Sequence, residues 1–105
     1  MNVIAEFTVI PIGTGVELSD YVAACQQVLE KSGLTYELHA NGTNLEGEWD
    51  EVMDAIKRCQ ETLHEMGVPR LSTIIKLGTR IDRPQTMADK MSSVKAKLEG
   101  ADEFK

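Results

Sequence analysis

Acidic side chains are the residues of this chain best suited to bind or polarise a charged group. Between Ser32 and Ile56 the sequence has no Lys or Arg, but it carries the carboxylates Glu37, Glu46, Glu48, Asp50, Glu51 and Asp54. A region with this uniform charge favours a cation. The alternative is a solvated acidic face followed by a helix start that attracts negative charge. The composition leaves both interpretations open.

Glu46 is the most informative of these acids. It alternates along a predicted strand with Leu45 and Gly47. We therefore expect its side chain to point to the uncovered face of a sheet, together with those of Glu6 and Thr8. On that face its carboxylate either pairs with Lys76 or Arg80 or faces a ligand. Gly47 would allow a ligand or another backbone to approach closely.

No other group of residues gives a comparable signal. The Pro-Ile-Gly-Thr-Gly loop at residues 11–15 lacks the phosphate-binding GK[ST] and GxGxxG patterns, which favours a simple strand-to-helix turn. His39 and His64 lack metal-ligand spacing, and no nucleophile–base arrangement can be assembled, so we expect no metal, no cofactor and no catalytic residue. Cys25 and Cys59 are too far apart for a CxxC pair and are expected to be reduced, buried thiols on helices.

The periodicity of apolar residues predicts the elements that position these groups. A period of two predicts strands at residues 3–12, 34–40, 43–48 and 71–81. A spacing of three and four predicts helices after an N-cap at Ser19, at residues 49–66 and from about Thr86 onward. Gly33 is expected to end the first helix in the left-handed conformation. Asn41-Gly42 predicts a type I′ hairpin turn with positive φ at both residues, and residues 100–105 are expected to fray.

The resulting order is β-α-β-β-α-β with an additional C-terminal helix, which is the ferredoxin-like α+β pattern in one domain spanning residues 1–105. Two helices should cover one face of a four-stranded antiparallel sheet. The other face stays open, with Ile4, Ile10 and Ile74 among its polar residues. Because such a face favours a partner subunit, we expect a homo-oligomer, built with the last helix or the fourth strand.

The charge balance bears on partners and location. The chain has 11 basic and 17 acidic residues and a net charge of −6, which disfavours nucleic acid and anionic membranes as partners. Residues 1–75 contain 4 basic and 12 acidic residues, whereas residues 76–105 contain 7 and 5. The first residues have no basic segment, and no apolar run is long enough to span a bilayer, so we expect a cytoplasmic protein.

Several segments together resemble a known family. They are residues 11–15, the Ser-Gly-Leu-x-Tyr-x-Leu segment at residues 32–38 and, as the most specific, the Gly-Thr-x-Leu-Glu-Gly-Glu-Trp-Asp-Glu-Val block at residues 42–52. On these motifs the chain resembles the small thiamine-binding proteins related to YkoF, over roughly the first 83 residues. The resemblance implies a ferredoxin-like subunit that forms dimers and dimers of dimers. It also implies non-catalytic binding of thiamine or its hydroxymethylpyrimidine moiety.

Thiamine is a cation with an aminopyrimidine ring, so its site needs a carboxylate or amide and an aromatic or apolar wall. Under this resemblance Glu46 would supply the carboxylate. The expected ligand contacts are Thr8, Tyr36, Asn41, Thr43, Asn44, Glu46 and Trp49. Core packing is the alternative role for Tyr36 and Trp49, and turn formation is the alternative for Asn41.

Two other functional classes compete with a binding protein. The first is a small oligomeric enzyme of the same fold, in which Glu46 and His39 would act as an acid–base pair. The second is a structural or regulatory assembly protein without a ligand.

Overall fold

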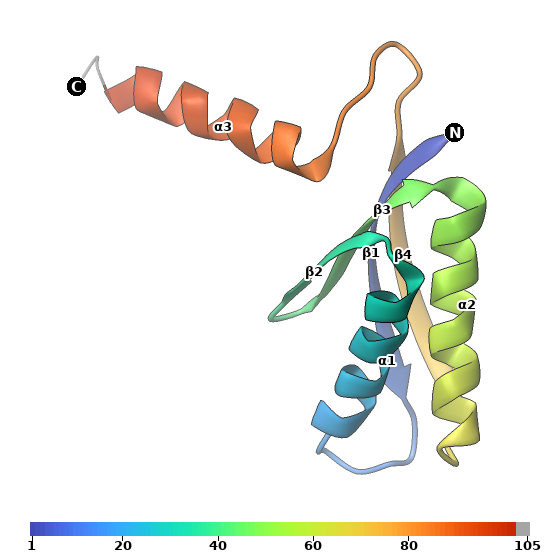
Figure 1. The fold of residues 1–105 in the computed structure, drawn as a ribbon. Helices are drawn as coiled ribbons and strands as arrows, with labels where there is room; N and C mark the ends of the chain where they lie inside the picture. The colour runs from blue at the N-terminus through green and yellow to red at the C-terminus, as the bar shows by residue number, and fades with distance from the viewer. Residues whose placement is uncertain (103–105) are drawn as a thin grey trace.

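A computed structural model describes residues 1–102 as an antiparallel sheet with two helices on one face (Figure 1). The elements in chain order are β1 (Asn2–Pro11), α1 (Ser19–Ser32), β2 (Thr35–His39), β3 (Gly42–Glu48), α2 (Trp49–Glu65), β4 (Leu71–Thr79) and α3 (Met87–Asp102). The four strands are ordered β2-β3-β1-β4, and every neighbouring pair is antiparallel. The predicted ferredoxin-like fold with an additional C-terminal helix is therefore confirmed.

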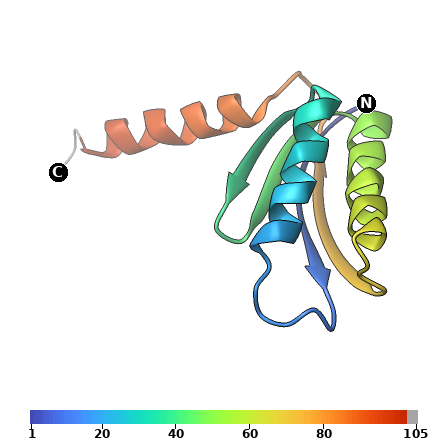
Figure 2. The same cartoon turned by 60° about the horizontal axis from the view of Figure 1, so that its bottom comes forward.

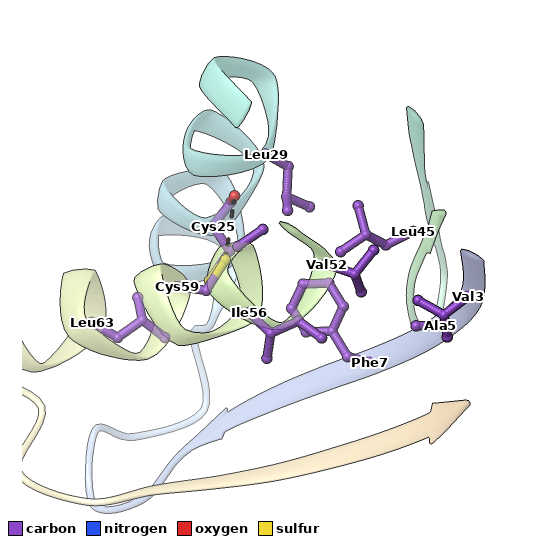
Figure 3. Close-up of a cluster of buried hydrophobic side chains, with 11 residues drawn as sticks. Val3, Ala5, Phe7, Cys25, Leu29, Leu45, Val52, Ile56, Cys59 and Leu63 are labelled. Carbon is purple, nitrogen blue, oxygen red and sulfur yellow. Dashed lines mark hydrogen bonds between the residues drawn. The ribbon is translucent and has the colours of Figure 1, made fainter. Parts of the chain in front are cut away.

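The hydrophobic core lies between the sheet and the layer formed by α1 and α2, which run side by side over it (Figures 2 and 3). Its buried members are Val3, Ala5, Phe7, Cys25, Leu29, Leu45, Val52, Ala55, Ile56, Cys59 and Leu63. They recur every second residue on β1 and every three to four residues on α2, so each element buries one face. This burial is the main favourable contribution to folding.

The two cysteines meet inside this core, where α1 crosses α2 (Figure 3). Both are buried and neither forms a disulfide, as predicted. The Cys59 thiol donates a hydrogen bond to the Cys25 carbonyl oxygen, with a distance of 3.8 Å. The contact with the Cys25 side chain, together with burial, raises the pKa of Cys59, so this thiol is not a nucleophile near neutral pH.

The face of the sheet opposite α1 and α2 is open, as the alternation predicts. Ile10 and Ile74 on this face are 37% and 62% exposed. On the edge strand β4 even the side chains that point to the helix layer stay accessible, since Ile75 and Leu77 are 37% and 38% exposed. The domain therefore presents apolar surface both on its open face and along one sheet edge.

Helix α3 extends away from the rest of the molecule, and none of the core side chains belongs to it (Figures 1 and 2). Its apolar residues Met91, Val94 and Leu98 are each more than half exposed. Within the described residues, no helix is both long and apolar enough to cross a membrane. Only the beginning of α3 contributes to the site described below.

The β2–β3 hairpin forms where it was predicted, but its turn is different. Ala40 and Asn41 connect the strands, while Gly42 already pairs with His39. Neither Asn41 nor Gly42 has a positive φ, so the predicted type I′ turn is wrong. A Cβ at Gly42 would lie 2.8 Å from the Thr8 hydroxyl oxygen. The close approach of β1, not the turn, explains this glycine.

The helix ends also differ in part from expectation. Gly33 follows α1 with a φ of 75°, as predicted. The N-cap of α1 is Leu18, without a side-chain hydrogen bond, and Ser19 is the first helical residue. Helix α3 includes residues 100–102, for which the expected fraying stays a prediction. The expectation for residues 103–105 lies outside the described part of the chain.

Candidate functional site

A hollow of about 780 Å³ lies over the open face of the sheet. The floor consists of residues from β1 and β3, among them Ile4, Glu6, Asn44 and Glu46, and of Gly78 on β4. One wall is formed by the segment that connects β4 to α3 and by the first turns of α3. Pockets of roughly 300–1,000 Å³ are typical of small-molecule sites, so this hollow is the leading candidate for a ligand.

Strand register brings the polar groups of the floor together. Glu46 on β3 lies opposite Ile4 on β1, while Glu6 on β1 lies opposite Asn44 on one side and Lys76 on the other. Residues directly opposite each other in an antiparallel pair have Cβ atoms about 4.5–5.5 Å apart. Two carboxylates and an amide from two neighbouring strands thus point into one space.

The carboxylate of Glu46 contacts a partner that the sequence did not indicate. Its Oε2 accepts a hydrogen bond from the backbone N–H of Met87, at 2.7 Å. Among the described residues, its Oε1 has no hydrogen-bond donor. Among the described residues, Glu46 does not form the predicted alternative ion pair with Lys76 or Arg80. Arg80 instead binds Asp82 through Nε and Nη2 at 2.5 and 2.8 Å. That ion pair lowers the pKa of Asp82.

Thr8 and Asn41 lie at the hairpin end of the same sheet. The Thr8 hydroxyl donates to the Asn41 carbonyl oxygen at 2.9 Å, and both residues line a second hollow of about 320 Å³ beside α1. His39 lies between them and Glu6: its Nδ1 accepts from the Asn41 N–H at 3.3 Å, and its Nε2 lies 3.2 Å from the Glu6 carboxylate. His39 therefore contacts Glu6, and the acid–base pair considered for His39 and Glu46 is not formed.

Besides Thr8 and Asn41, three more of the residues expected to contact the ligand lie outside the large hollow. The Tyr36 hydroxyl donates to Glu30 at 2.6 Å, which raises the pKa of the phenol. Thr43 is 5% exposed, accepts a hydrogen bond from Gln26 at 3.0 Å and lines the smaller hollow. Trp49 starts α2 and packs against the core. Of the seven expected contacts, only Asn44 and Glu46 line the large hollow.

Comparison with known proteins identifies the family. A profile of the family described as thiamine-binding protein matches residues 5–95. The chain belongs to this thiamine-binding protein family. It is 52% identical to the UPF0045 protein sll0230 of Synechocystis, over 96% of this chain and 84% of that protein.

Solved structures agree with the fold of this thiamine-binding family member. The crystal structure of hypothetical protein MJ1052 from Methanocaldococcus jannaschii is 34% identical, with a TM-score of 0.80 over 89% of this chain and 95% of that one. A Thermotoga maritima protein, provisionally described as a thiamine biosynthesis/salvage protein, has 22% identity and a TM-score of 0.76. The match covers 90% of this chain and 99% of the Thermotoga chain. At 22% identity it supports the fold alone.

The wall of the large hollow is the part of the candidate site that the motifs missed. It contains Arg83, Thr86, Met87, Lys90 and Met91. All of them except Arg83 lie beyond the part of the chain that carries the motif resemblance, although the family match continues to residue 95. The available signal was the change in charge, since basic residues exceed acidic ones only from residue 76 onward.

Proposed function

We propose that this protein binds thiamine or its hydroxymethylpyrimidine moiety, without catalysing a reaction, in the hollow over the open sheet face near a subunit interface. The observation that carries the proposal is that Glu6, Glu37 and Glu46, from three different strands, line one hollow in a member of the thiamine-binding family. Thiamine carries a positive charge and an amino group, and both complement carboxylate oxygens.

Glu46 is the residue best prepared to bind the ligand. The hydrogen bond from the Met87 N–H orients the carboxylate through Oε2, which leaves Oε1 to accept from an amino group of the ligand. Met87 and Met91 line the same hollow, and methionine side chains adapt well to aromatic rings. A side chain that is already oriented loses less entropy on binding, which favours affinity.

The proposal includes a homo-oligomer, a dimer of dimers, located in the cytoplasm. Its support is the apolar surface that the subunit leaves accessible: Ile74 on the open face, Ile75 and Leu77 on the edge strand β4, and the apolar residues of α3. An unprotected edge strand with exposed aliphatic side chains favours pairing with another chain. A subunit placed against the open face would shelter the hollow from water, which strengthens its electrostatic interactions.

Calorimetry and the fluorescence of Trp49, the single tryptophan, test this function. The wild-type protein is expected to bind thiamine or hydroxymethylpyrimidine. Glu46→Gln should weaken binding of the cation by about 1–3 kcal/mol, a roughly 5–150-fold rise in Kd, because it removes a charged hydrogen bond. Glutamine retains an acceptor for the Met87 N–H, so α3 should stay in place. Glu61→Gln, which removes the same charge from an exposed position on α2, should bind as wild type.

Two results would contradict this proposal at different levels. If neither heat nor a fluorescence change appears at millimolar ligand, the protein does not bind thiamine or its pyrimidine. If the ligand binds but Glu46→Gln leaves its affinity unchanged, Glu46 is not the carboxylate that recognises the cation.

A further inference from the structure

The large hollow carries positive side chains as well as carboxylates, and the two kinds come from different parts of the fold. The carboxylates belong to β1, β2 and β3. Lys76 belongs to β4, Arg80 and Arg83 follow that strand, and Lys90 lies on α3. Carboxylates and cations therefore line the same hollow, with Lys76 directly opposite Glu6 in the register of β1 and β4.

Three of these cations are not neutralised by the protein. Arg80 is bound on both oxygens of Asp82. For Lys76, Arg83 and Lys90, no carboxylate of the described residues lies within ion-pairing distance. Positive groups that converge on a concave surface without partners attract an anion.

The backbone of the first turn of α3, which carries Lys90, is fixed by hydrogen bonds. The Thr86 N–H donates to the Asp89 carboxylate and the Asp89 N–H donates to the Thr86 hydroxyl, both at 3.0 Å. This reciprocal capping stabilises the first turn, and Glu46 accepts the Met87 N–H beside it. Since these backbone donors are occupied, an anion would be bound by side chains such as Lys90 and not by the helix end.

We infer that the ligand of this hollow is a phosphorylated form of the cationic heterocycle, with its ring at the carboxylates and its phosphate at Lys76, Arg83 and Lys90. This inference rests on the function proposed above. The planar guanidinium of Arg83 matches phosphate oxygens in geometry, and the lysines add point charges. A hollow of about 780 Å³ has room for both ends of such a molecule.

The test compares thiamine with thiamine monophosphate by calorimetry at one ionic strength. The wild-type protein is expected to bind the phosphate ester at least tenfold more tightly. The double variant Arg83→Gln/Lys90→Gln should lose that advantage without weakening the binding of unphosphorylated thiamine, because it removes two positive charges from the surroundings of a cation. Arg70→Gln/Lys95→Gln removes the same two residue types outside the hollow and should behave as wild type. Circular dichroism should show that each variant is folded.

The possible outcomes separate this inference from the proposed function. If thiamine binds and its phosphate ester binds no more tightly, the inference is overturned and the proposed function stands. If the ester binds more tightly but Arg83→Gln/Lys90→Gln retains the full advantage, these residues are not the phosphate site and the inference is overturned. If neither compound binds, the proposed function fails and the inference fails with it.

Discussion

Replacing Gly42 by alanine tests why the hairpin requires a glycine. Gly42 has no positive φ, so the alanine backbone is allowed, and the reduced freedom of the unfolded chain would by itself stabilise the protein by about 0.4–1 kcal/mol. In the folded state, however, the new Cβ would lie 2.8 Å from the Thr8 hydroxyl oxygen and 3.1 Å from the Phe7 carbonyl oxygen. Both atoms belong to β1, the central strand that pairs with β3 and β4.

The expected cost follows from what must move. Thr8 is β-branched, and turning its hydroxyl away from Gly42 would break the hydrogen bond to the Asn41 carbonyl, which is worth about 0.5–1.5 kcal/mol. Overpacking a well-filled site typically costs about 1–3 kcal/mol. After the gain in the unfolded state is subtracted, Gly42→Ala should destabilise the protein by about 0.5–2 kcal/mol. For a domain of this size each kcal/mol lowers the melting temperature by about 4–8 °C.

Urea denaturation followed by far-ultraviolet circular dichroism, at one protein concentration, measures this change. Thr8→Ala removes both the crowding and the hydrogen bond, whereas Thr8→Val removes the hydrogen bond and keeps the bulk. The Gly42→Ala substitution should therefore cost less in the Thr8→Ala background than in the Thr8→Val background. A Gly42→Ala protein as stable as the wild type, or an equal cost in both backgrounds, would refute the argument from close approach.

Two further predictions concern a titration and self-association. The hydrogen bond to Glu30 raises the pKa of Tyr36. In an ultraviolet titration, the step of Tyr36 is the one that is lost in Tyr36→Phe, and it should lie above the ordinary tyrosine pKa of about 10. In Glu30→Gln the pKa of this step should fall. The Tyr36–Glu30 hydrogen bond stabilises the folded state fully at a pH below the ordinary tyrosine pKa, and this contribution is lost as the pH rises through the pKa of Tyr36 in the folded state. A Tyr36 titration step at the ordinary pKa would contradict the contact. Leu77→Lys, on the edge strand β4, should weaken self-association and so reduce the molar mass measured by light scattering. Val16→Lys, at a loop position that is 93% exposed, should leave the molar mass unchanged. Equal molar masses for both variants would exclude the β4 edge as an interface.

The spacing of apolar residues along the sequence was sufficient to predict the strands and helices and the direction of the side chains on the strands. The alternation along β3 placed Glu46 on the open face, and the structure agrees. The period of two in the strand predicted at residues 34–40 sets Tyr36 on one face with Leu34 and Leu38. The fold shows that this is the helix side, where Tyr36 reaches Glu30 on α1. Such features are predictable because side-chain direction repeats every two residues in a strand.

The reasons for two glycines were not local and could not be predicted from neighbouring residues. Gly42 was assigned to a turn, but it accommodates Thr8 of β1. Gly47 lines the large hollow, and a Cβ there would lie 2.7 Å from the Leu34 side chain. In both cases the space beside the glycine is occupied by a side chain from outside β3. Such a contact is visible only in the packed structure.

The sequence by itself determined the ferredoxin-like fold, the open face and the acidic character of that face, because each depends on periodicity and composition. Tertiary structure alone decided the partner of Glu46: the Met87 N–H that it accepts lies 41 residues away in the chain. It also decided that cations from the part of the chain after residue 75 line the same hollow as the carboxylates. Contacts of this kind depend on strand register and on the path of α3 after β4, and neither is encoded in the spacing of residues along one segment.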